Sequence, residues 1–182
     1  MKTSLLILGT DNHPDTGGRY NRALHQVAIE TLSPSQTILT TEVDQTWDIK
    51  TEAEKFLAAD TVIFQFPVFW YMPPAGLKHY MDSVYQHGIM FGGVKPDGTA
   101  GLLSGRYMLS ATWNAPAAHF DNPDTFFSGC SVDNALIAMR KSQEFLGLSP
   151  LPHFHCHEVQ SSPDIARDKS KYRAHLKKVF SI

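Results

Sequence analysis

Short apolar runs alternate with longer segments of helical period along most of the chain. Compact aliphatic and aromatic runs bounded by glycine or proline are typical of buried strands. Such runs predict strands at residues 4–8, 37–43, 61–66, 107–111 and 151–155, the second of them partly polar and therefore at a sheet edge. Apolar residues that recur three or four positions apart predict helices at residues 21–32, 51–59, 74–85, 133–146 and 165–180.

The alternation of strands and helices predicts a parallel sheet that is covered by helices on both faces. Five such units favour the doubly wound strand order 2-1-3-4-5. We therefore expect an α/β protein with a flavodoxin-like three-layer sandwich and a five-stranded parallel sheet. The 182 residues contain no internal repeat or long linker, so residues 1–182 are expected to form a single domain.

The composition excludes several classes of protein. Hydrophobic residues make up 42% and charged residues 19% of the chain, which is typical of a globular domain. A formal charge of −2 offers no field for nucleic acid or an anionic membrane, and we expect neither partner. No apolar run approaches the roughly 18 residues of a membrane helix. The two cysteines, Cys130 and Cys156, form no disulfide framework, which favours a reducing compartment such as the cytoplasm.

Three unusual loops follow the first, third and fourth predicted strands. Ligands of open parallel sheets bind at the carboxyl ends of the strands, where these loops converge. The first loop contains Thr16, Gly17 and Gly18 before a helix, followed by the positive charge of Arg19. It matches neither the G-x-G-x-x-G nor the G-x-x-x-x-G-K-[ST] motif. Small residues at a helix start suit an anion, although they are also common as ordinary caps.

The second and third loops are rich in aromatic residues. Phe69, Trp70 and Tyr71 lie beyond the proline that ends the third strand, so strand burial does not explain them. Trp113 and Asn114 follow the fourth strand, and an asparagine amide offers both a donor and an acceptor to a ring edge. Together with an anion-binding helix end, these loops predict a site for a flat heterocycle that carries phosphate. A hydrophobic flap or a subunit contact is the alternative.

Other kinds of site find less support in the sequence. His153, His155 and His157 would share one strand face, which indicates either metal ligands or solvent-exposed neighbours. Because no further ligand group accompanies them at a recognisable spacing, we assign no metal site. A phosphate-receiving regulator would need a carboxylate after the third strand, where Gln65 stands instead, and the hydrolase motif G-x-S-x-G is absent.

Nearly the whole chain resembles a known family, the flavin-dependent NAD(P)H:quinone oxidoreductases of flavodoxin-like fold. The matching stretches are GTDNHPDTGGRYN, QFPVFWYMPPAGLKHYMDSVY, YMLSATWNAP, DTFFSGCSVD and FLGLSPLP. The resemblance implies a homodimer that binds FAD and passes two electrons from NAD(P)H to a quinone. It also implies ping-pong kinetics, because nicotinamide and quinone would stack in turn at the same place.

The resemblance also implies which residues bind the cofactor. The FAD diphosphate would lie against Thr16, Gly17, Gly18, Arg19, Tyr20 and Asn21. The isoalloxazine ring and ribityl chain would lie against Pro67, Val68, Phe69, Trp70 and Tyr71, and the ring edge against Thr112, Trp113, Asn114 and Ala115. No residue is assigned as catalytic: His13 resembles a family position near phosphate, and His119 follows the third loop. An azo- or nitro-compound reductase and a flavodoxin-like electron carrier are the alternative functions.

Overall fold

The computed structural model describes residues 1–10 and 17–182. Its sheet has the strand order β2-β1-β3-β4-β5, with β6 also paired to β4, and every pair is parallel. The strands are β1 (Thr3–Leu8), β2 (Thr37–Glu42), β3 (Thr61–Pro67), β4 (Arg106–Thr112), β5 (Ser149–Pro150) and β6 (Phe154–Cys156). The expected order 2-1-3-4-5 is confirmed, as is the edge position of β2.

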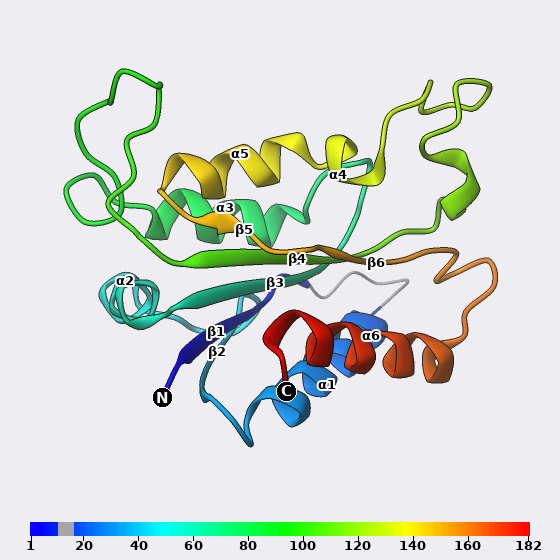
Figure 1. Ribbon diagram of the computed structural model, residues 1–182, viewed down its shortest axis with the longest axis horizontal. Helices are drawn as coiled ribbons and strands as arrows, with labels where there is room; N and C mark the ends of the chain where they lie inside the picture. Colours follow the sequence, from blue (N-terminus) through cyan, green and yellow to red (C-terminus); the bar gives the residue numbers. More distant parts are fainter. Residues whose placement is uncertain (11–16) are drawn as a thin grey trace.

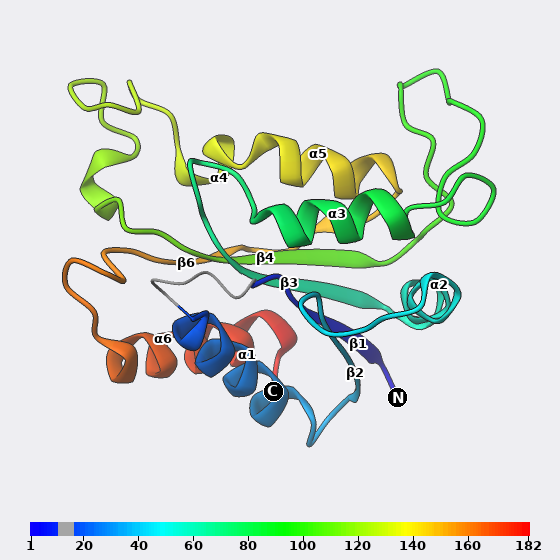
Figure 2. The same ribbon diagram turned by 180° about the vertical axis from the view of Figure 1, so that it is seen from behind.

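Helices cover both faces of the sheet, which confirms the flavodoxin-like three-layer arrangement. The helices are α1 (Arg19–Leu32), α2 (Ile49–Ala58), α3 (Ala75–Val84), the 3₁₀ turn η1 (Ala117–His119), α4 (Val132–Ala135), α5 (Ile137–Phe145) and α6 (Ile165–Phe180). Figures 1 and 2 show α3, α4 and α5 on one face, with α1 and α6 together on the other. No helix in the described part of the chain is long and apolar enough to cross a membrane.

The two faces of the sheet have separate apolar cores, and β4 contributes to both. Its alternate residues Tyr107 and Leu109 pack in the core below α2, α3 and α5, whereas Met108 packs in the core below α1 and α6. Because side chains alternate along a strand, Ser110 and Thr112 lie on the α1 face with Met108. This alternation decides which side chains at the end of β4 reach the candidate site.

Two expected elements are interrupted in the structure. The predicted fifth strand at residues 151–155 is replaced by two short strands, β5 and β6, which both pair with β4. Pro150 and Pro152 lack the N–H that a continuous ladder requires, which accounts for the gap. The predicted helix at residues 133–146 is divided at Leu136, whose φ and ψ of −104° and 25° are not helical.

Candidate functional site

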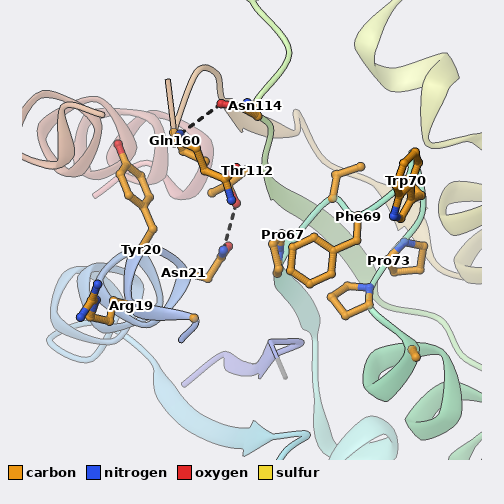
Figure 3. Close-up of a pocket in the computed structure, with 15 residues that line it drawn as sticks. Arg19, Tyr20, Asn21, Pro67, Phe69, Trp70, Pro73, Thr112, Asn114 and Gln160 are labelled. Atoms are coloured by element: carbon orange, nitrogen blue, oxygen red, sulfur yellow. Dashed lines mark hydrogen bonds between the residues drawn. The ribbon is translucent and has the colours of Figure 1, made fainter. Parts of the chain in front are cut away.

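A cavity of about 1010 Å³ opens at the carboxyl ends of β3 and β4. The cavity is lined by Gly18, Arg19, Tyr20, Asn21, Pro67, Val68, Phe69, Trp70, Pro73, Pro74, Ala75, Thr112, Asn114, Val159 and Gln160. Figure 3 shows Tyr20 and Asn21 on the α1 side, with Phe69, Trp70 and Pro73 on the opposite side. The three loops singled out in the sequence therefore contribute to one cavity.

The start of α1 forms one wall of the cavity and has features that suit an anion. Gly17 and Gly18 have φ of 54° and 64°, a left-handed backbone that glycine adopts without strain. A Cβ on Gly18 would lie 2.4 Å from the Thr10 hydroxyl oxygen, so the close approach of these segments requires glycine. The first turn of α1 holds no acidic side chain, and its leading N–H groups lack intrahelical acceptors. Gly17 is exposed and outside the lining, and the predictions for Thr16 and His13 lie outside the described residues.

A strained two-residue hairpin forms the aromatic wall. Phe69 and Met72 exchange two backbone hydrogen bonds of 2.9 Å, while Trp70 and Tyr71 between them have φ of 49° and 64°. Positive φ at both central residues defines a type I′ turn, which ordinarily contains Asn-Gly. A side chain at such a φ costs about 1–2 kcal/mol per residue. Because strain of this kind gathers at functional sites, the turn indicates that Trp70, 91% exposed, is held ready for a ligand or a partner.

Tyr71 faces a different environment from Trp70. It is not part of the cavity lining, and its ring stacks on Phe126 with centroids 5.4 Å apart. Phe126 in turn meets Phe127 edge to face. The hairpin thereby connects the cavity to an exposed aromatic surface formed by the long loop after β4.

Only part of the predicted third loop reaches the cavity. Thr112 and Asn114 line it, whereas the Trp113 side chain is buried on the α5 face. The Trp113 ring packs edge to face on Phe120 at 5.1 Å, and its indole N–H donates to His155 Nδ1 at 3.4 Å. Ala115 also lies outside the lining. The structure thus places the Trp113 side chain in the core and outside the cavity lining, because neighbouring residues at a strand end point to opposite faces.

Two groups of lining residues escaped the sequence analysis. Val159 and Gln160 come from the segment between β6 and α6, where the Asn114 side-chain oxygen accepts N–H bonds from Gln160 at 3.2 Å and Ser161 at 3.0 Å. The dashed line in Figure 3 marks the first of these bonds. The other group, residues 73–75, opens α3. The proline pair in this second group lies at the start of the predicted helix at 74–85. Nothing in the sequence, by contrast, places residues 159–160 beside the third loop.

Tyr20 fastens the cavity wall to α6. Its hydroxyl donates to Asp168 Oδ2 at 2.6 Å, and the Arg167 Nε–H donates to the other carboxylate oxygen at 2.9 Å. Burial, followed by the bond to Asp168, raises the pKa of Tyr20 well above its ordinary value of 10. Tyr20 therefore remains a neutral phenol and does not supply a base to the cavity.

The three histidines near β6 are bonded to neighbouring protein groups. His153 Nδ1 accepts the Leu109 N–H at 3.2 Å, His155 Nε2 lies 3.1 Å from an Asp133 carboxylate oxygen, and His157 Nδ1 donates to a backbone carbonyl at 3.0 Å. Burial lowers the pKa of His153 to about 4 and also lowers the pKa of His157. Among the described residues, no group of three His, Cys, Asp or Glu is arranged to hold a metal. These histidines connect β6 with its neighbours.

The lining that the structure describes contains no Asp, Glu, His, Lys, Ser or Cys. His119, the other histidine considered from the sequence, is exposed in η1 and is not among the lining residues. The described lining combines a helix start suited to an anion with an aromatic wall, an arrangement that suits chemistry carried out by a bound organic group.

Comparisons with known proteins agree with this geometry. A family model described as having a flavodoxin-like fold matches residues 5–179. The chain is 39% identical to the NADPH:quinone oxidoreductase MdaB of Haemophilus influenzae, over 97% of this chain and 98% of that protein.

Solved structures show the same fold. A presumed quinone reductase of Klebsiella pneumoniae superposes with a TM-score of 0.77 at 23% identity, covering 100% of this chain and 84% of that one. General stress protein 14 of Treponema denticola, solved in complex with FMN, gives a TM-score of 0.74 at 22% identity, covering 98% of this chain and 99% of that one. On the family match and the near full-length likeness to MdaB, the chain belongs to the flavodoxin-like NAD(P)H:quinone oxidoreductases, a family of enzymes.

Proposed function

We propose that this protein uses a bound flavin to transfer two electrons from NAD(P)H to quinones. The observation that carries the proposal is the cavity at the carboxyl edge of the sheet, which joins an anion-binding helix start to a strained aromatic hairpin. The described lining has no acid–base group to perform the reaction itself. A bound flavin would supply that chemistry by accepting a hydride equivalent and passing it on.

The residues present fit FAD. The start of α1, with Gly18 and Arg19, would offer backbone N–H groups and a positive charge to the diphosphate of FAD. Val68, Phe69 and Trp70 offer apolar and aromatic surface to a flat ring. The cavity of about 1010 Å³ lies at the upper end of the usual size range for small-molecule sites, which favours the larger flavin.

The purified protein is expected to be yellow and to release FAD on heating. The T. denticola relative was solved with FMN, so the two flavins must be separated and not inferred from colour alone. Absorption spectroscopy followed by chromatography of the released cofactor performs the test. Released FMN would contradict the choice of FAD, and protein that binds neither flavin on reconstitution would contradict the whole proposal.

Steady-state turnover of NADPH with menadione separates the enzyme from a flavodoxin-like electron carrier. NAD(P)H and the quinone would occupy the same place beside the aromatic hairpin in turn. We therefore expect parallel lines in double-reciprocal plots, which is the pattern of ping-pong kinetics. An electron carrier would show negligible turnover. Electron carriers of this kind dock through strong surface charge, and a formal charge of −2 is too small to provide it. An azo- or nitro-compound reductase would share this site, and comparing such substrates with menadione ranks the two activities.

We further propose that the active form is a two-fold homodimer. Exposed aromatic side chains gather beside the cavity, with Trp70 91%, Tyr71 46%, Met72 52% and Phe126 73% exposed. Contiguous apolar surface of this kind marks interaction sites, and a two-fold dimer is the commonest way to cover it. Light scattering at micromolar concentration is expected to give the dimer mass, and Phe126→Lys is expected to lower it. A monomeric wild-type protein with full activity would refute the proposal.

A further inference from the structure

Four buried polar side chains form one chain of hydrogen bonds beneath the cavity. The Ser110 hydroxyl donates to Gln65 Oε1 at 2.7 Å, Gln65 Nε2 donates to Asn21 Oδ1 at 2.7 Å, and Asn21 Nδ2 donates to Thr112 Oγ1 at 2.9 Å. None of the four residues is more than 3% exposed. The dashed line between Asn21 and Thr112 in Figure 3 marks the last link, at the cavity.

The sequence places these side chains together for simple geometric reasons. Ser110 and Gln65 are paired neighbours on β4 and β3, and both lie on the α1 face of the sheet. Thr112 lies two residues beyond Ser110 on that same face. Asn21 lies on the buried side of α1, one turn before Leu24. Buried polar groups of this kind carry a large penalty unless they are paired, and each of these four is paired.

All the bonds in the chain run in one direction. Each amide accepts with its oxygen and donates with its nitrogen, so the donors point from Ser110 towards Thr112. Thr112 Oγ1 is used as an acceptor, which leaves the hydroxyl hydrogen for another partner. No acceptor for that hydrogen is found among the described residues, and Thr112 lines the cavity.

We infer that this chain of hydrogen bonds makes Thr112 a hydrogen-bond donor to the cavity ligand. Gln65, Asn21 and Ser110 are its positioning residues. The inference rests on the proposed function, in which the ligand is a flavin whose ring edge lies near Thr112. A donor held in advance stabilises whichever ligand form carries more negative charge, and aligned hydrogen bonds strengthen one another. The chain of hydrogen bonds that ends at Thr112 therefore favours binding of the reduced flavin over binding of the oxidised flavin.

The alternative role of the four side chains is only to hold α1 against the sheet. Reversing the direction of their hydrogen bonds distinguishes the donor role from that structural role. In Gln65→Glu the carboxylate accepts from Ser110 and also from Asn21, because an ionised carboxylate has no hydrogen to donate. The Asn21 amide must then turn, and its oxygen accepts the Thr112 hydroxyl hydrogen. Thr112 no longer donates into the cavity, although the size of the side chain at position 65 hardly changes.

The test compares the two-electron midpoint potential of bound flavin in the wild type and in Gln65→Glu. We expect roughly tenfold weaker preference for reduced flavin, which corresponds to a potential about 30 mV lower for a two-electron couple. The shift is expected to be largest at alkaline pH, where the buried carboxyl group is ionised. Flavin affinity by titration provides a second readout that does not depend on turnover.

The added negative charge also lowers the potential, so a double-mutant cycle is needed. Thr112→Val removes the hydroxyl, and in that background Gln65→Glu retains only its charge effect. The wild-type background must show the larger shift. Gln36→Glu is a matched control, because Gln36 is also buried and accepts a serine hydroxyl, from Ser4 at 2.5 Å, near the amino ends of the strands.

The outcomes separate the inference from the function beneath it. A larger shift in the wild-type background, with little change in Gln36→Glu, supports the donor role. Equal shifts in both backgrounds would overturn it while leaving flavin binding and quinone reduction standing. A wild-type chain that binds no flavin would overturn both. If Gln65→Glu does not fold, Asn21→Asp repeats the test, because its carboxylate accepts from Gln65 and from Thr112 at once.

Discussion

Trp70→Ala is expected to weaken flavin binding by roughly ten- to hundredfold, equivalent to about 1–3 kcal/mol of lost stacking. The side chain is 91% exposed in the isolated chain, so its removal takes little apolar surface out of the core. The φ of 49° is retained by alanine, which leaves the turn as strained as before. Titration of the apoprotein with FAD measures the affinity, and thermal unfolding of the same apoprotein is expected to be nearly unchanged.

Trp47→Ala is the matched control for this prediction. Trp47 meets Tyr80 edge to face at 5.3 Å, and its indole N–H donates to the Val43 carbonyl at 3.3 Å, away from the cavity lining. Its truncation is expected to lower the melting temperature, as for other packed aromatic residues, without changing FAD affinity. The opposite pattern for Trp70, a large fall in melting temperature beside unchanged affinity, would show that it serves the fold.

The architecture could be predicted from the sequence because each central strand is a short apolar run with a clear end. Residues 61–66 and 107–111 read as buried strands, and β3 and β4 occupy those positions with one or two more residues. The two interrupted elements, the divided helix and the divided fifth strand, could not be predicted in this way. The division at Leu136 and the separation of β5 from β6 arise from backbone angles and pairing with β4, which hydrophobic periodicity does not report.

The site was only partly predictable for a related reason. The carboxyl-end rule brought the three loops together, and Gly18, Trp70 and Thr112 indeed line one cavity. To predict which way a side chain points at the start of a loop, one must know which face of the sheet each strand residue occupies. In the structure Thr112 lies on the α1 face, whereas Trp113 lies in the core on the opposite face. Val159 reaches the site only because distant segments pack together, and no local motif announces such a contact.

Acidification is expected to destabilise the apoprotein through its buried neutral histidines, among which His25 is one of two whose pKa falls to about 4. His25 lies in α1 and is 5% exposed, and its Nδ1 has no hydrogen-bond partner among the described residues. Burial lowers its pKa to about 4 from an ordinary 6.5; nearby Glu42 opposes this shift and Arg22 adds to it. Between these two values the unfolded chain binds the proton and the folded chain does not. The stability is therefore complete above pH 6.5 and is lost as the pH falls towards 4.

The expected loss from His25 alone is about 2–3 kcal/mol between pH 7 and pH 4.5. Urea unfolding of the apoprotein at the two pH values measures it, and His25→Gln is expected to reduce the difference by that amount, whatever the variant's stability at pH 7. His119→Gln, which changes an exposed histidine, is expected to leave the difference as in the wild type. If His25→Gln and the wild type lose the same free energy on acidification, then His25 is protonated in the folded chain, and the acid sensitivity must come from other groups, beginning with His153, whose pKa burial also lowers to about 4.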